Sequence, residues 1–137
     1  MTYAGEKILI GGAALRNLGN DRHTEDFDYL INDKNDKRAF ITSDAVDYLN
    51  ANGNKFFAEI YKKETGNEQA TPQSLMDLKC YAFVQHCQNF NFSKADSCEY
   101  DIKFLYRNFK VLPKIVKKYI SEGELSEIEK IIKNMKF

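Results

Sequence analysis

The sequence predicts a small α+β protein in which strands come first and helices follow. Short apolar runs bounded by Gly, Asn and Asp fill residues 7–49, which is typical of strands and turns. Apolar residues at helical spacing fill residues 72–132. The 137 residues are 43% hydrophobic, enough to bury a core within one compact domain. We therefore expect a single domain over 1–137, with a sheet part at 1–65 and a helical part at 71–137.

The N-terminal half reads as a sheet with two short helices. Lys7–Ile10 is an apolar run ended by Gly11-Gly12, which predicts a buried strand and a turn. Good helix formers at 13–18 are followed by Gly19, a predicted C-cap. Residues 26–31 alternate polar and apolar at their start, as a half-buried strand does. The remaining predicted elements are strands at 39–42 and 45–49 and a helix at 56–63.

The C-terminal half reads as helices. Thr71 is a predicted N-cap and Pro72 a first helical residue, for a helix that runs to about Gln88. A loop is expected at 89–94 and a second helix at 97–108. Pro113 predicts the start of a third helix that runs to about Ser121, and Gly123 separates it from a last helix.

Composition bounds the compartment and the partners. No apolar run reaches 18 residues, so we expect no membrane span and no membrane partner. The N-terminus lacks the basic start and apolar stretch of a secretion signal. The three cysteines are an odd count without CxxC spacing, which favours a reducing compartment. The sequence thus indicates a cytoplasmic protein.

Charge is zero overall but differs between the halves. Residues 1–70 hold nine Lys/Arg against twelve Asp/Glu, a net charge of −3, and residues 71–137 hold eleven against eight, a net of +3. An acidic half facing a basic half suits a metal-bound polyanion. The basic residues of the second half recur three and four apart and could form one face for an RNA backbone, or a face that is merely solvated. They are Lys103, Arg107, Lys110, Lys114 and Lys117.

The stretch 11–28 carries the pattern with most chemical content. Gly11 and Gly12 follow a strand and precede a helix, which allows a ligand phosphate to approach the backbone. Asp26 and Asp28 stand at i and i+2 of a strand, so both carboxylates should point to one face. Two close carboxylates repel unless a cation lies between them, and oxygen ligands suit Mg²⁺ or Mn²⁺. The alternative is a solvated acidic strand end beside an ordinary Gly-Gly turn.

This stretch resembles the nucleotidyltransferase superfamily, in particular the small bacterial branch of AbiEii-type and MenT-type toxins from toxin–antitoxin systems. That branch reads Gly-Gly-x-Ala-Leu and then Gly-x-x-Arg-x-Thr-x-Asp-φ-Asp, and this chain matches it from Ile10 to Leu30. Residues 74–82, Ser-Leu-Met-Asp-Leu-Lys-Cys-Tyr-Ala, resemble the family's Leu-x-x-x-Lys-φ-x-Ala helix. Residues 100–105, Tyr-Asp-Ile-Lys-Phe-Leu, resemble its Asp-φ-x-x-Leu helix. The resemblance implies a small mixed sheet packed with C-terminal helices.

The resemblance also implies roles for single residues. Asp26 and Asp28 would be catalytic metal ligands, and Lys79 would neutralise phosphate charge. Asp101 would orient Lys79 or assist the acceptor. The residues that would contact the nucleotide triphosphate, ATP included, are Gly11, Gly12, Arg22 and Thr24. Arg22 could hold a phosphate through two hydrogen bonds, or could simply pair with Glu25 or Asp21.

Helix periodicity and two departures from the family add to this. Lys79 lies near the apolar face of its predicted helix, so it must reach water or find a carboxylate partner. The family's Lys-Asp sequence before the position of Asp101 is replaced here by Ser97-Cys98-Glu99, so the chain departs from the family on the acceptor side. The superfamily often has a third carboxylate on a later strand. Asp47 is the candidate for this third metal ligand, with Asp44 as the runner-up and a surface acid as the alternative for either.

Two functions are compatible with these patterns. The first is metal-dependent transfer of a nucleotide from an NTP to a hydroxyl of RNA or tRNA, of a protein or of a small molecule. The second is a catalytically weak or inactive protein of the same fold that acts as an inhibitor or antitoxin through a cognate protein partner.

Overall fold

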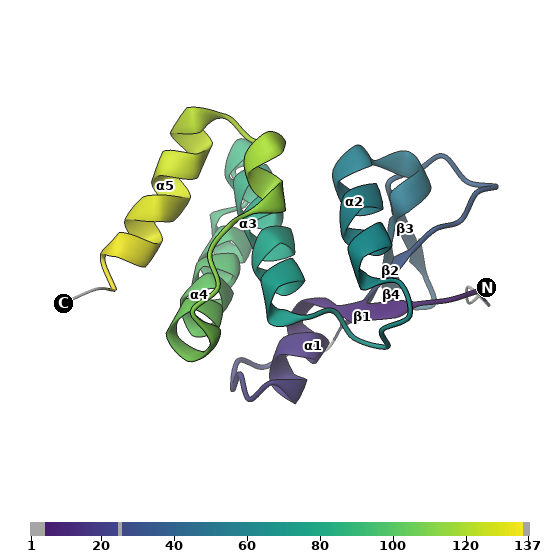
Figure 1. The fold of residues 1–137 in the computed structure, drawn as a ribbon, viewed down its shortest axis with the longest axis horizontal. Coiled ribbons are helices and arrows are strands. Elements are labelled where there is room, and N and C mark those ends of the chain that lie inside the picture. The colour runs from purple at the N-terminus through teal and green to yellow at the C-terminus, as the bar shows by residue number, and fades with distance from the viewer. Residues whose placement is uncertain (1–4, 25, 136–137) are drawn as a thin grey trace. The chain divides into compact units, whose positions relative to one another are not determined.

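The structure, a computed structural model, describes residues 5–24 and 26–135 (Figure 1). The chain forms two compact units, Met1–Thr71 and Pro72–Phe137. A four-stranded mixed sheet lies in the first unit. The described residues of the second unit form helices and one 3-10 turn, and no strands. The predicted α+β class, with strands before helices, is therefore confirmed.

The sheet of the first unit has the order β1-β2-β4-β3. Its strands are β1 (Ile8–Ile10), β2 (Phe27–Ile31), β3 (Phe40–Ser43) and β4 (Val46–Asn50). β1 runs antiparallel to β2 and β3 antiparallel to β4, whereas the central pair, β2 and β4, is parallel. All four predicted strands exist. β2 begins one residue later than expected, so Asp26 precedes the strand instead of opening it.

Two helices accompany the sheet. α1 (Gly11–Asn17) starts two residues before its predicted start, and Gly19 follows it with φ +103°, a left-handed conformation that glycine adopts without strain. α2 (Lys55–Glu64) follows a short 3-10 turn, η1 (Ala51–Gly53), and begins where the Asn54 side chain accepts a hydrogen bond from the Phe57 amide at 3.0 Å.

α2 covers one face of the sheet. The Phe57 ring meets that of Phe40 edge to face, with the centroids 5.5 Å apart. Register places Phe40, Leu49 and Leu30 side by side on this face. The core of the first unit forms here, and its fully buried members include Ile8, Ile10, Leu15, Leu30, Phe56 and Ile60.

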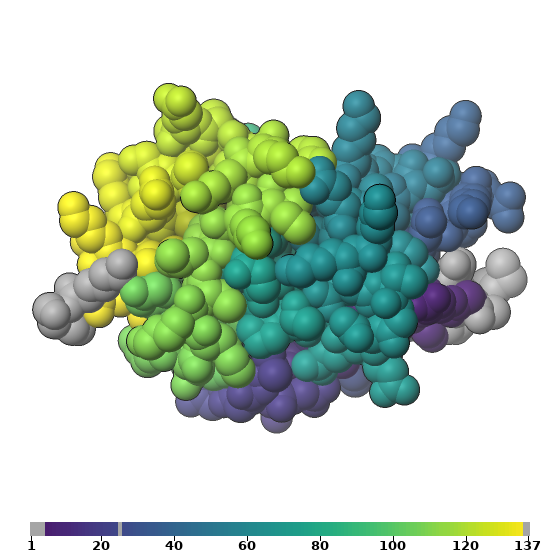
Figure 2. Space-filling view, in the orientation of Figure 1, coloured from purple at the N-terminus to yellow at the C-terminus, as the bar shows by residue number. Residues whose placement is uncertain are grey.

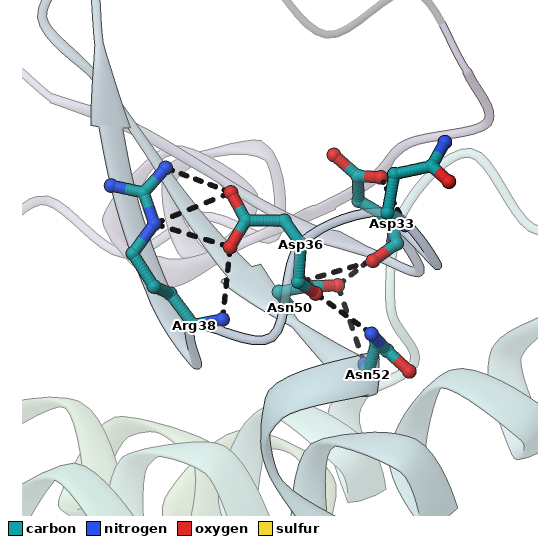
Figure 3. A network of polar contacts seen from close by, with 6 residues as sticks. Asp33, Asp36, Arg38, Asn50 and Asn52 are labelled. Carbon is teal, nitrogen blue, oxygen red and sulfur yellow. Dashed lines mark hydrogen bonds and ion pairs between the residues drawn. The ribbon is translucent and has the colours of Figure 1, made fainter.

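A polar network holds the loop between β2 and β3 (Figure 3). Asn50, at the end of β4, is fully buried. Its amide nitrogen donates to the carbonyl oxygens of Asp33 and Asp36 at 3.3 and 2.9 Å, and its Oδ1 accepts from the Asp33 amide at 2.8 Å. Satisfying the polar groups of this turn from one buried side chain fixes how the chain enters β3.

The contact between Arg38 and Asp36, in the same loop, should make the stability of the loop depend on pH. The Arg38 guanidinium donates to the Asp36 carboxylate, with Nη2 at 2.8 Å from Oδ2, and lowers the pKa of Asp36 from 3.8 to about 2. A lowered carboxyl pKa stabilises the native loop above the ordinary value, and that stabilisation is lost as pH falls towards 2. NMR titration of the Asp36 carboxyl should give a midpoint near 2, and Arg38→Gln should move it towards 3.8. A midpoint near 3.8 in the unmodified protein would contradict the contact.

The second unit holds α3 (Pro72–Gln88), α4 (Phe92–Phe109), the 3-10 turn η2 (Ile115–Lys118) and α5 (Glu122–Lys133). α3 has the predicted bounds. α4 begins five residues before its predicted start, because Asn91 caps it by accepting a hydrogen bond from the Lys94 amide. α5 begins before Gly123, not after it: Ser121 and Glu124 form a reciprocal capping box, so Gly123 lies in the first turn.

The helix predicted from Pro113 to Ser121 is wrong, since only the turn η2 forms. Asp77, a fully buried residue of α3, holds this segment instead. Its Oδ1 accepts hydrogen bonds from the amides of Lys114 and Val116, at 2.7 and 3.1 Å. A carboxylate from another helix therefore binds the amides that a helix after Pro113 would leave open at its start.

In the part of the chain that the structure describes, no helix is both long and apolar enough to cross a bilayer.

Candidate functional site

The central acids of the predicted site lie on adjacent strands of the first unit. In the parallel pairing of β2 with β4, Asp28 is the direct partner of Asp47. Partners on neighbouring strands are about 4.8 Å apart along the hydrogen-bonding direction, and their side chains point to the same face. Both residues are half-buried. Like charges placed in this way repel each other, so the pair is costly unless a cation lies nearby.

The two glycines of the motif lie against other members of the same motif. Gly11 has φ +69°, and a β-carbon added there would overlap the Asp28 carboxylate. A β-carbon on Gly12 would come within 2.9 Å of the Thr24 side chain. Glycine is therefore required here so that Asp28 and Thr24 can pack against the start of α1. The sequence suggests that the two glycines make room for a ligand. Their packing against Asp28 and Thr24 is by itself enough to require glycine at both positions.

Asp26 lies just before β2 and is exposed. The Thr24 hydroxyl donates to its carbonyl oxygen at 3.5 Å, which links Thr24, Asp26 and the glycine corner. Arg22, in the same loop, is half-buried, and its amide donates to the Asn20 side chain at 3.4 Å. Glu25, one predicted partner of Arg22, lies outside the described residues.

The third carboxylate has a partner that the sequence did not reveal. The Thr42 hydroxyl donates to Oδ1 of Asp47 at 2.7 Å, and Thr42 is the register partner of Asp47 on β3. The two-residue turn between these strands explains the pairing, since Asp44 and Ala45 both have positive φ, as a type I′ turn requires. Asp44, the runner-up, thus sits at the tip of a hairpin.

The donor chemistry of the first unit fits a hard divalent cation in part. Asp28 and Asp47 offer carboxylate oxygens at one place on the sheet, which is the ligand type that Mg²⁺ and Mn²⁺ take. Over residues 5–24 and 26–135, however, no three His, Cys, Asp or Glu side chains gather closely enough to hold a metal ion. A cation here would have to draw further ligands from phosphate oxygens and water, as Mg²⁺ commonly does.

The two remaining predicted residues pair with each other in the second unit. Nζ of Lys79, on α3, is 3.1 Å from Oδ2 of Asp101, on α4. The Asp101 side chain is completely buried and that of Lys79 is 14% exposed. Of the two outcomes predicted for Lys79, a reach to water or a carboxylate partner, the structure shows the carboxylate partner. The site residues are brought together as two groups, one in each unit.

The basic residues of the second half do not form one helical face. Lys103 pairs with Glu99 at 3.1 Å, and Lys110 ends α4 in a left-handed conformation with its Nζ 5.4 Å from the centre of the Tyr106 ring. Lys114 and Lys117 lie beyond the end of α4, just before and within η2. The predicted stripe is therefore interrupted at the end of α4.

Comparison of the chain with known protein families, with curated proteins and with solved structures finds no match.

Proposed function

We infer that this chain is a metal-dependent nucleotidyltransferase that moves a nucleotide from an NTP to an acceptor hydroxyl. The observation that supports this most is the register of the sheet, which puts Asp28 and Asp47 side by side with the Gly11 backbone against Asp28. The family motif contains Gly11 and Asp28, and Asp47 is the candidate for the third carboxylate of the superfamily. Two neighbouring carboxylates repel each other unless a cation lies between them. Such a pair beside a glycine corner is the arrangement that would hold a cation and a triphosphate together.

The residues would divide the work as follows. Asp28 and Asp47 would hold Mg²⁺ or Mn²⁺, and Asp26, which lies just before β2, would be a further ligand. The cation would supply charge to polarise the α-phosphoryl group. Gly11, Gly12, Arg22 and Thr24 would border the triphosphate. Thr42 would orient Asp47 through its 2.7 Å hydrogen bond.

Lys79 would neutralise phosphate charge, with Asp101 as its positioning residue. Asp101 is buried within the second unit and holds the ammonium group at one place, while Lys79 keeps a partly exposed side chain. An ammonium held in this way can meet an anion without first losing side-chain freedom. The acceptor hydroxyl would belong to RNA, particularly a tRNA end, to a protein or to a small molecule.

A second candidate is a binding protein of the same nucleotidyltransferase-like fold, an inhibitor or antitoxin that acts through a cognate protein partner. The replacement of the family's Lys-Asp sequence by Ser97-Cys98-Glu99 favours it, because the chain departs from the family on the acceptor side there.

Incubation with labelled NTPs, Mg²⁺ or Mn²⁺, and bulk cellular RNA and protein separates the two. The enzyme should label one acceptor class, and only with the metal present. Thermal melting gives a parallel measurement, because an NTP that binds only the native protein raises its melting temperature. A protein that labels nothing, and whose melting responds to no NTP with metal, would leave the binding protein as the explanation.

A further inference from the structure

Asn52 and Gly53, in the turn η1, pack against the loop between β2 and β3. Nδ2 of Asn52 donates to the Asp36 carbonyl oxygen at 2.8 Å (Figure 3) and to the Lys34 carbonyl oxygen at 3.5 Å. A β-carbon added at Gly53 would overlap the backbone of Arg38. The packing of this loop therefore depends on the amide of one residue and on the missing side chain of the next.

The pair Asn52-Gly53, the only Asn-Gly pair in the sequence, is chemically labile. The backbone nitrogen of Gly53 can attack the side-chain carbonyl carbon of Asn52, because glycine has no side chain to shield that nitrogen. The new C–N bond closes a five-membered imide, and the side-chain nitrogen leaves as ammonia with the proton that the Gly53 nitrogen loses. Water then opens the imide at either of its carbonyl groups, which leaves aspartate or isoaspartate at position 52.

The closed loop holds the two reacting groups apart. Ring closure requires the Asn52 side chain to turn back towards the following peptide bond, and that movement breaks its hydrogen bonds to the loop. The helical backbone of the 3-10 turn also keeps the Gly53 nitrogen away from the side-chain carbonyl carbon. The reaction therefore needs the loop to open, which costs less than global unfolding at an exposed loop. Figure 2 shows this blue segment at the surface of the first unit, with side chains standing out from it.

We propose that Asn52 is a deamidation site that the closed loop protects, and that its modification keeps the loop from closing again. Neither product can donate a hydrogen bond to the carbonyl oxygens of Asp36 and Lys34, and both place a negative charge beside those acceptors. Isoaspartate also lengthens the backbone by one methylene group next to Gly53, which already lies against Arg38. The inference is independent of the proposed enzymatic function.

Unfolding in urea tests the protection. The protein is incubated at mildly alkaline pH with and without urea, and mass spectrometry of the digested chain follows the change from amide to acid at residue 52. The native protein should react at least about tenfold more slowly than the unfolded chain. In urea, Asn52→Gln should react far more slowly than the parent, since its longer side chain would have to close a larger ring. Equal rates with and without urea, or no reaction at Asn52 in urea, would overturn the proposal.

A second Asn-Gly pair on an unprotected turn gives a comparison within one molecule. Phe90→Gly places glycine after Asn89, an exposed residue whose side chain makes no hydrogen bond within the described residues. Phe90 has φ +58° and is 79% exposed, so glycine fits there without strain or loss of core packing. In the native variant, Asn89 should lose ammonia at least about tenfold faster than Asn52, and in urea the two should react at similar rates. Equal rates in the native variant would show that the loop does not protect Asn52.

Asn52→Asp tests the effect of the modification on the loop directly, because it supplies the charge of the product without the reaction. The Asp33 amide donates to Oδ1 of Asn50 at 2.8 Å and reports on the closed loop. Its hydrogen exchange should become at least about tenfold faster in this variant, while amide exchange in α4 should match that of the parent. Exchange of the Asp33 amide at the parent rate would show that the modified loop stays closed.

Discussion

Asp28→Asn should lower nucleotidyl transfer by about 100-fold or more while leaving the fold intact. A bound divalent cation contributes several kcal/mol to transition-state stabilisation, and about 1.4 kcal/mol corresponds to a factor of ten in rate. The substitution replaces one of two neighbouring carboxylates on β2 and β4 with a neutral amide, and the one carboxylate that remains would hold the cation poorly. The measurement is initial transfer rate at saturating metal, with melting temperature recorded in parallel.

The melting temperature distinguishes a lost ligand from a lost fold. Without metal, Asp28→Asn should melt close to the parent, because it keeps the size of the side chain and removes repulsion between adjacent acids. Asp47→Asn should lose transfer similarly, whereas Asp44→Asn, at the hairpin tip, should keep it. Transfer at the parent rate in Asp28→Asn would refute the assignment of the metal site. Loss of transfer in Asp44→Asn but not in Asp47→Asn would show that Asp44, and not Asp47, is the third carboxylate.

Local signals predicted the elements well where a short stretch of chain decides the structure. Pro72 after Thr71 fixes the start of α3, and apolar runs ended by glycine or asparagine give the strands. The prediction was wrong where a distant residue decides. η2 is held by Asp77, which is 37 residues before Lys114, and no window around Pro113 contains that carboxylate. Asp77 itself looks like an ordinary polar position of an amphipathic helix.

The candidate site follows the same division. The spacing of Asp26 and Asp28 can be read directly, but their unequal exposure depends on where β2 begins, and a one-residue shift leaves Asp26 outside the strand. The link from Asp47 to Thr42 depends on the turn type. Asp44-Ala45 is not an Asn-Gly or Asp-Gly pair, so the sequence predicts two strands there but neither the turn type nor the register of the hairpin. With that register, residues 42 and 47 would have been expected to pair.

Lys79→Met should destabilise the protein by about 3–5 kcal/mol, the usual cost of removing one partner from a buried ion pair. Asp101 is completely buried, so its carboxylate would lose the compensating charge that the Lys79 ammonium group places 3.1 Å away. Asp101→Asn should cost less, because Lys79 is 14% exposed and can turn its ammonium group towards solvent. Urea unfolding of the three proteins at pH 7 measures the difference.

A double variant separates this charge effect from lost packing. Lys79→Met combined with Asp101→Leu should recover most of the stability, since an apolar pair of similar volume often replaces a buried ion pair without loss. If the double variant were less stable than Lys79→Met alone, packing and not charge would be the reason that this pair joins α3 to α4.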